Sequence, residues 1–190
     1  AGFSVIPRLI LPYNGMKQSN SDGGDEMVWG FSDMELQLPF SPKREGKWKY
    51  GFGPQFGFKT RQNESFAGGG NGIGLVGVTS GDITKQISFM GFISNLWSYD
   101  GNFNTTTIQP YLIYNSARVP GMYAGYMQAI TVNWKIDNGA SIPLGLSIGK
   151  SWALSKEYGF DFNVGYYYYS AKPSGSLDHL VKFGIGVVFP

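Results

Sequence analysis

The feature that most constrains the fold of this chain is an alternation of apolar and polar residues with a period of two, repeated in segments of about ten residues. The clearest example is the segment 48–59. Successive side chains of a β-strand point to opposite faces, so this segment predicts a strand with one oily face and one polar face. The oily face holds Trp48, Tyr50, Phe52, Pro54, Phe56 and Phe58, and the polar face holds Lys49, Gly51, Gly53, Gln55, Gly57 and Lys59.

The same split recurs near both ends of the chain. Its oily positions are Phe3, Val5, Pro7, Leu9 and Leu11; Met34, Leu36, Leu38 and Phe40; Ile142, Leu144, Leu146 and Ile148; and Phe160, Phe162, Val164 and Tyr166. The pattern predicts strands over residues 3–11, 28–40, 47–59, 72–80, 85–97, 106–115, 122–136, 141–152, 158–169 and 178–189. The connections between these strands, of which 12–27 and 60–71 are the longest, are expected to be loops.

The period alone does not show whether the oily faces meet each other or lipid, because a soluble β-sandwich also alternates. Charged residues make up only 15% of the chain while aromatic residues reach 16%, and there are 28 glycines, which favours strands and turns over helices. The chain contains no run of about 18 apolar residues, so a transmembrane helix is excluded. A barrel strand remains compatible, because it shows only every second side chain to lipid.

Three features indicate that the apolar faces contact lipid. The five Trp residues, expected at the membrane interface, fall at the ends of expected strands, where aromatic girdles lie. The polar faces carry Gly, Gln, Asn, Lys and Asp, which a dry core could bury only at a large desolvation cost. The last expected strand of the sequence is amphipathic and ends near Phe189, a pattern similar to the signal by which outer-membrane barrels are recognised for assembly. The interface residues are Trp29, Trp48, Trp97, Trp134 and Trp152.

These patterns predict an all-β fold, namely a closed antiparallel transmembrane β-barrel of about ten strands. One domain is expected over residues 1–190, located in the outer membrane of a Gram-negative bacterium. The expected surroundings are membrane lipid and lipopolysaccharide, and the C-terminal strand is expected to engage the barrel-assembly machinery. No nucleic-acid partner is expected, because Lys and Arg are dispersed at a net charge of +2, and the pattern identifies no protein partner.

Six short motifs are spaced along the chain: Gly53–Phe56, Asn95–Ser98, Ile108–Asn115, Thr131–Trp134, Ile142–Lys150 and Val188–Pro190. Together they resemble a family of poorly characterised proteobacterial outer-membrane barrels, labelled as transporters, as neuromedin-U-like, or as similar to barrels of the meta pathway of phenol degradation. The resemblance covers most of the chain from residue 3 and implies a barrel and, loosely, transport. Members of that family carry further strands before the part that matches Ser4 to Leu11, so ten and twelve strands both stay open. Residues 60–65 replace an acidic, Gly-rich stretch of the family.

The polar faces are the nearest feature to a functional site. In one interpretation they line a narrow channel for water and small solutes, with weak selectivity from mixed charges. In the other, a barrel of this size is nearly filled by its own side chains, which form an internal salt-bridged core. The candidate lining residues are Arg8, Asp33, Glu35, Gln37, Lys49, Gln55, Lys59, Gln109, Thr131, Asn133, Lys135, Asp161, Asn163 and Lys182.

No enzyme activity, metal or cofactor is expected. With one His and no Cys, a transition-metal site would depend on carboxylates alone. His179 has the outward parity, where an interfacial position explains it better than a role in lipid hydrolysis. The Gly-rich stretch 67–72 lacks the helix pattern of a phosphate-binding loop. In the run of four tyrosines, Tyr166 and Tyr168 are expected to face lipid.

Two functions are therefore weighed. The leading hypothesis is a porin-like outer-membrane channel or transporter for small solutes through a narrow polar lumen. The alternative is a closed structural or partner-binding barrel without transport.

Overall fold

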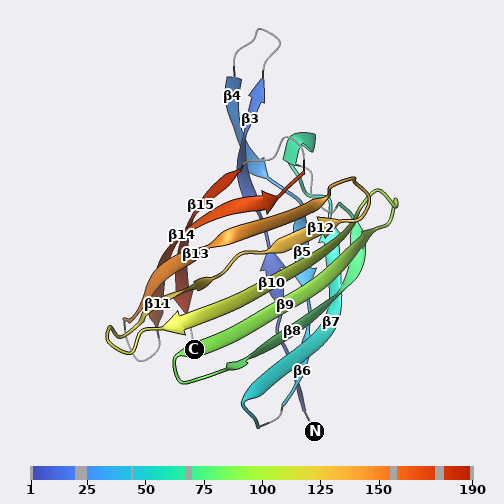
Figure 1. The fold of residues 1–190 in the computed structure, drawn as a ribbon. Helices are drawn as coiled ribbons and strands as arrows, with labels where there is room; N and C mark the ends of the chain where they lie inside the picture. The colour runs from blue at the N-terminus through green and yellow to red at the C-terminus, as the bar shows by residue number, and fades with distance from the viewer. Residues whose placement is uncertain are drawn as a thin grey trace. The chain divides into compact units, whose positions relative to one another are not determined.

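The computed structural model describes residues 2–19, 25–43, 45–66, 70–154, 158–173 and 178–188. Within these ranges the chain forms fifteen β-strands, one short 3-10 helix, η1 (Glu64–Phe66), and no α-helix. The strands that pair do so in antiparallel fashion, so the prediction of an all-β antiparallel fold is confirmed (Figure 1). In this part of the chain no helix is both long and apolar enough to cross a membrane.

The first expected strand, 3–11, is divided into two pieces and the second, 28–40, into three, and together with a further strand inside the expected loop 12–27 these pieces pair as one hairpin. The register of β1 with β6 continues into that of β2 with β5 without a shift. Pro7, Pro12 and Pro39 lie at the interruptions, as expected for a residue that has no N–H to donate to the ladder. The pieces are β1 (Phe3–Val5), β2 (Arg8–Ile10) and β3 (Tyr13–Ser19), followed by β4 (Asp25–Phe31), β5 (Met34–Gln37) and β6 (Phe40–Pro42).

A β-bulge lies between β4 and β5. Ile10 is opposite Glu35 and Tyr13 is opposite Phe31, so two residues of the first strand face the three residues 32–34 of the second. The extra residue of a bulge bends the strand and re-aims a side chain. Here the bulge contains Asp33, whose side chain is almost completely buried.

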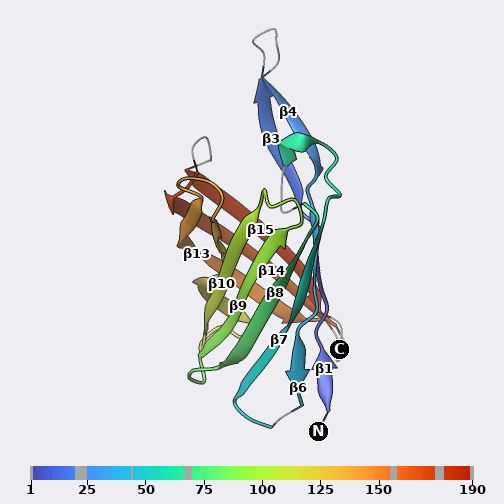
Figure 2. The ribbon, with the colours of Figure 1, turned by 90° about the vertical axis from the view of Figure 1, so that its right-hand side faces the viewer.

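The prediction that residues 12–27 form a loop is wrong. β3 and β4 pair over their full lengths as a separate two-stranded sheet, visible in Figure 2. The ring of Tyr13 stacks on Trp29 at 6.2 Å and meets Phe31 edge-on at 5.0 Å. Residues 14–19 contain no apolar alternation, so the pairing in this hairpin carried no periodic signal.

The later strands follow the expected segments closely, with one exception. The expected strand 122–136 is two strands, because residues 127–129 leave the ladder and residues 134–138 form a turn. Among the described residues all strands except β3 and β4 belong to one 13-stranded sheet. Its later strands are β7 (Trp48–Phe58), β8 (Gly72–Asp82), β9 (Ile87–Ser98), β10 (Asn104–Asn115), β11 (Met122–Tyr126), β12 (Ile130–Asn133), β13 (Ala140–Ala153), β14 (Gly159–Ala171) and β15 (His179–Val188).

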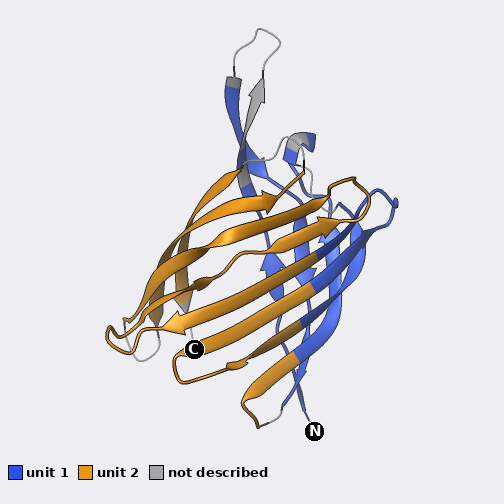
Figure 3. Cartoon of the chain, viewed as in Figure 1, with its two compact units in different colours: residues 1–43, 51–77, 94–106 blue, residues 44–50, 78–93, 107–190 orange. Residues whose placement is uncertain are grey.

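The chain divides into two compact units (Figure 3). Unit 1 comprises residues 1–43, 51–77 and 94–106, and unit 2 comprises residues 44–50, 78–93 and 107–190. Strands β7 to β10 therefore each contribute residues to both units, whereas β11 to β15 belong to unit 2 alone.

In unit 2 the two faces of the sheet have opposite character. Phe183 and Ile185 of β15 are 69% and 73% exposed. The alternate positions carry buried polar or small residues, among them Ser147 of β13 and Asn163 of β14. Gly184 leaves room for Asn163, because a Cβ atom at position 184 would lie only 2.5 Å from the Asn163 side-chain nitrogen. The expected alternation is confirmed, and it is the apolar face that is exposed.

On β7 of unit 1, too, the apolar face is exposed and the polar face is buried, and we call this arrangement the inversion of the sheet. Phe52 is 59% exposed, while Gly53, Gln55 and Gly57 are buried. All five Trp side chains are exposed. Four of them lie at or next to a strand end, but Trp29 lies inside β4, so the expected end position is wrong for Trp29.

Candidate functional site

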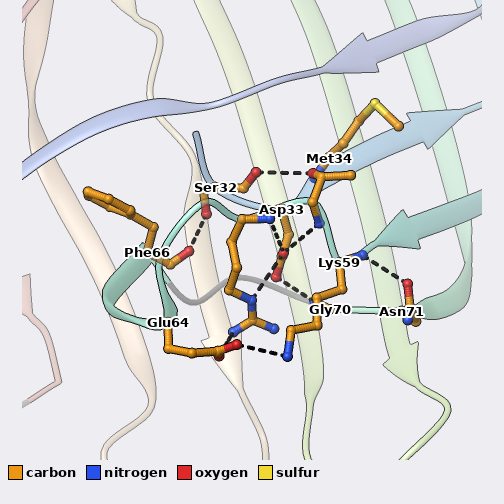
Figure 4. Close-up of polar contacts among 10 residues, drawn as sticks. Ser32, Asp33, Met34, Lys59, Glu64, Phe66, Gly70 and Asn71 are labelled. Atoms are coloured by element: carbon orange, nitrogen blue, oxygen red, sulfur yellow. Dashed lines mark hydrogen bonds and ion pairs between the residues drawn. The ribbon is translucent and has the colours of Figure 1, made fainter. Parts of the chain in front are cut away.

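A tightly connected polar group of unit 1 surrounds Asp33, and we call it the Asp33 cluster: Asp33, Lys59, Thr60, Arg61, Glu64 and Gly70 (Figure 4). The backbone N–H groups of Thr60 and Arg61 donate to Asp33 Oδ1 at 3.1 and 3.2 Å. The backbone N–H of Gly70 donates to Oδ2 at 2.9 Å. Arg61 Nε also lies 3.2 Å from Oδ1 as an ion pair. A buried carboxylate is thus surrounded by donors, as burial of a charge requires.

Glu64 forms the exposed rim of this cluster. Its carboxylate lies 2.8 Å from Lys59 Nζ and 3.2 Å from an Arg61 guanidinium nitrogen. The hydrogen bond from Lys59, followed by the charge of Arg61, holds the pKa of Glu64 below its ordinary value of 4.5. The Arg61 side chain thereby joins a buried acid to a solvent-exposed one.

The Asp33 cluster fastens the 59–71 connection to the bulge. Ser32 Oγ donates to the carbonyl of Phe66 at 2.6 Å, and the Met34 N–H donates to Thr60 Oγ1 at 2.9 Å (Figure 4). Phe66 is buried, and a Cβ atom at Gly30 would lie 2.8 Å from its ring. Because protein donors surround Asp33, the arrangement suits loop anchoring and leaves little capacity to bind a solute.

Two side-chain pairs continue the polar face of unit 1 from the Asp33 cluster. Gln55 Nε2 of β7 donates to Glu35 at 2.8 Å, and an Arg8 guanidinium nitrogen donates to Gln37 Oε1 at 3.4 Å. The buried Gln55 Oε1 accepts no hydrogen bond from the described residues. An acceptor in this position would bind a water molecule or a polar solute.

A second group, the Asp161 cluster, lies on the polar face of unit 2 and comprises Tyr123, Ser151, Asp161 and Asn163. The Tyr123 hydroxyl donates to Asp161 Oδ1 at 2.8 Å, and the Ser151 hydroxyl donates to Oδ2 at 2.7 Å. Asn163 Nδ2 adds a third hydrogen bond at 3.1 Å. Three side chains from β11, β13 and β14 thus converge on one carboxylate, which ties these strands together on their polar side.

A break between β11 and β12 interrupts the strands of this polar face. The N–H of Met127 donates to the buried Tyr167 hydroxyl at 3.2 Å, and its carbonyl accepts from Lys182 Nζ at 3.4 Å. Lys182 also lies 3.5 Å from Gln128 Oε1. Side chains from β14 and β15 therefore satisfy backbone groups that left the ladder.

A proline on the adjacent strand accompanies this break. β11 and β12 pair with β13 in one continuous register, so residues 127–129 leave the ladder without any insertion. That register brings Pro143 to the break, and its carbonyl instead accepts from the Tyr126 hydroxyl at 2.8 Å. The N–H and C=O of a strand residue point to the same side, and the Pro143 carbonyl points toward the break. A residue other than proline at position 143 would therefore direct an N–H at residues 127–129, and proline has none to donate.

The other predicted lining residues are more scattered. Gln109 and Thr131 lie half-buried on β10 and β12. Asn133 ends β12 and accepts from the N–H of Lys135, which is exposed in the turn after the strand. Lys49 is exposed near the start of β7, and Lys59 follows its end. Lys135 and Lys59 are therefore not strand residues, contrary to the expected boundaries.

Several residues of the candidate site were missed by sequence reasoning. Arg61 lies in an expected loop, and nothing in the local pattern links it to Asp33. Tyr167 was identifiable, because the parity that turns Tyr166 and Tyr168 outward turns Tyr167 inward, and it is fully buried while its neighbours are exposed. His179 is exposed, as expected, and its Nδ1 lies 2.7 Å from the Tyr166 hydroxyl. The predicted terminal aromatic Phe189 and the residues 67–69 of the Gly-rich stretch lie outside the described residues.

Among the described residues, no group of three or more His, Cys, Asp or Glu side chains is arranged to hold a metal ion. Comparisons with protein-family models, with curated proteins and with solved structures gave no match to this chain.

Proposed function

We propose that this protein is an integral β-barrel of a bacterial outer membrane with a narrow polar channel for small solutes. The observation that carries the proposal is the inversion of the sheet, whose apolar face is exposed and whose polar face is buried. Exposed apolar residues oppose one another on adjacent strands, as Leu146 opposes Tyr166 and Val164 opposes Phe183. Monomeric soluble proteins rarely expose contiguous apolar surface beyond a few hundred Å², whereas hydrocarbon solvates such a face favourably.

The proposal includes closure of the sheet. Among the described residues the strand order begins at β1 and ends at β15. An unpaired strand edge in hydrocarbon costs several kcal/mol for each unsatisfied backbone group. Pairing of β15 with the first strand segment, 3–19, removes both edges and gives a barrel of ten segments.

Closure is tested with engineered disulfides, for which a chain without Cys offers a clean background. Leu9→Cys is combined in turn with a Cys at positions 181, 183, 185 and 187. One register is expected to cross-link, because opposed strand residues bring their Cβ atoms within disulfide range. The positive control joins Leu146→Cys with Tyr166→Cys, which are opposed on β13 and β14. Cross-linking of the control pair without any cross-link to Leu9→Cys contradicts closure.

The channel function is supported by the polar face in both units. It carries cations and anions together, with Arg8 and Glu35 in unit 1 and Lys182 and Asp161 in unit 2. Such a lining allows hydrated solutes to pass with weak charge selectivity. The resemblance of the sequence motifs to barrels labelled as transporters points the same way.

A second candidate function is a closed barrel that supports or binds other proteins. The Asp161 cluster and the Lys182 contacts favour it, because interlocked side chains of this kind fill a small barrel. In that case the β3–β4 hairpin, on which Tyr13 and Trp29 are exposed, is a natural contact region.

The two candidates are separated by reconstituting the purified protein in planar lipid bilayers. A channel is expected to give discrete conductance steps that grow when Lys182→Ala removes a long inward side chain. The matched control is Val181→Ala on the adjacent, exposed position of β15, which should leave the step size unchanged. Correctly folded protein that inserts and yet gives no steps contradicts the channel and favours the closed barrel.

A further inference from the structure

A pocket of about 320 Å³ lies within unit 2, on the sheet formed by β7 to β10. Its polar lining comes from the start of β7, the end of β8 and the start of β9. Its apolar lining comes from the side chains of Met90 and Ile113. The residues around it are Lys47, Lys49, Ser80, Gly81, Asp82, Ser88, Phe89, Met90 and Ile113.

The charges of the pocket do not cancel. Lys47 and Lys49 contribute two positive charges and Asp82 contributes one negative charge. Asp82 is already engaged, since its Oδ1 accepts from the Ser88 hydroxyl at 2.7 Å. Lys47 Nζ donates to the carbonyl of Ile83 at 3.1 Å, which keeps two further donor positions on that ammonium group. The pocket therefore presents one excess positive charge with ammonium donors beside an apolar wall.

We propose that this pocket binds small organic monoanions that carry an apolar or aromatic body, with carboxylates as the simplest class. The anionic group lies between Lys47 and Lys49, where charge-assisted hydrogen bonds are available. The apolar body lies against Met90 and Ile113. The inference deepens the proposed channel function by naming a solute class, and direct binding tests it without any requirement for conductance.

The experiment uses benzoate as the probe, with the neutral benzamide as its isostere, and measures binding to the folded full chain in detergent by titration calorimetry and ligand-observed NMR. Saturable binding of benzoate is expected, and benzamide is expected to bind at least about tenfold more weakly, because it lacks the charge. Lys49→Gln is expected to weaken benzoate binding about tenfold. The matched control is Lys85→Gln, an exposed cation of the adjacent 83–86 turn that does not line the pocket.

A second variant distinguishes a specific loss of benzoate binding from a loss caused by misfolding. Asp82→Asn keeps an acceptor for Ser88 and removes the negative charge, so benzoate binding is expected to strengthen several-fold, which a misfolded protein would not do. Equal binding of benzoate and benzamide, or an unchanged affinity in both Lys49→Gln and Asp82→Asn, overturns the proposal. Conductance without benzoate binding rejects this pocket and leaves the channel standing, whereas benzoate binding without conductance supports the pocket and rejects the channel.

Discussion

At the scale of single residues, Asp33 shows how a charge becomes compatible with burial. Its two oxygens accept from three backbone N–H groups and lie against the Arg61 guanidinium, so the carboxylate retains partners after leaving water. The bulge in β4–β5 turns the side chain toward the 59–71 connection. One acid therefore fastens residues 60, 61 and 70 of that connection to the bulge.

The first prediction concerns the variant Asp33→Asn. The amide group keeps the size of the side chain, but it removes the charge and directs its own N–H groups at donors. We expect a loss of about 1–3 kcal/mol in the free energy of unfolding, with faster hydrogen exchange at the N–H groups of Thr60, Arg61 and Gly70. The matched control is the exposed Glu45→Gln, which should change neither measurement. An Asp33→Asn protein with unchanged exchange at these amides contradicts the assigned role.

The second prediction is a pH dependence of the same loop. Lys59 and Arg61 lower the pKa of Glu64 in the folded state, so this contribution is fully present above the ordinary value of 4.5 and is lost as the pH falls through the lower folded-state pKa. Amide exchange in residues 59–66, corrected for intrinsic rates, should therefore rise below about pH 4.5. In Glu64→Gln the rise attributable to this group should vanish. A Glu64 carboxyl that titrates at its ordinary pKa in NMR would remove the basis for the prediction.

At the scale of elements, the break between β11 and β12 shows how a strand can lose three residues from its ladder while its register is kept. Pro143 has no N–H to donate to the adjacent segment 127–129. The side chains of Tyr126, Tyr167 and Lys182 instead form hydrogen bonds with the backbone groups of Pro143 and Met127. Backbone groups that have no ladder partner need such substitutes wherever water is excluded. The irregularity is therefore stabilised by inward side chains of β14 and β15.

The third prediction tests this stabilisation with Tyr167→Phe. The variant loses the acceptor for the Met127 N–H and the hydroxyl contact with Ser147, which lies 2.7 Å away. We expect a loss of about 1–3 kcal/mol of stability and faster exchange of the Met127 amide, because a buried donor is left unsatisfied. Tyr168→Phe, on the opposite and exposed face of the same strand, is the matched control and should be nearly neutral. Equal effects of the two variants would show that the hydroxyl of Tyr167 has no special role.

At the scale of the whole molecule, the inverted faces determine which solvent the sheet requires. In water the exposed side chains of β13 to β15 would be a strong aggregation surface, since they form contiguous pairs across strands. In hydrocarbon the same surface is favourable, and the polar face must then be enclosed. The proposals of membrane insertion and of barrel closure therefore depend on each other.

The fourth prediction separates the two solvents with Phe183→Arg in the middle of β15. If hydrocarbon surrounds the strand, the variant should lose about 2–4 kcal/mol of stability in lipid bilayers, because the charge must be desolvated. The matched control is Phe183→Leu, which keeps the position apolar and should cost far less. A change within about 0.5 kcal/mol for Phe183→Arg, as is usual for an exposed side chain in water, contradicts the membrane proposal.

The sequence by itself determined most of the strand segments and the side of each that is apolar. Parity placed Tyr166, Tyr168 and Phe183 on the exposed face and Gln55 and Asn163 on the buried one. This was possible because the side-chain direction in a strand depends only on local spacing along the chain. The hairpin of β3 and β4 was missed for the same reason, since residues 14–19 carry no apolar alternation.

Only the tertiary structure decided how the polar residues are grouped. The Asp33 cluster requires a bulge between β4 and β5. The contacts of Met127, which follows β11, require Tyr167 of β14 and Lys182 of β15 to reach the same backbone segment. Both depend on the register between strands that are far apart in the sequence, and a shift of one residue would turn each side chain to the other face. Local alternation carries no information about register, so the faces were predictable and the partners on them were not.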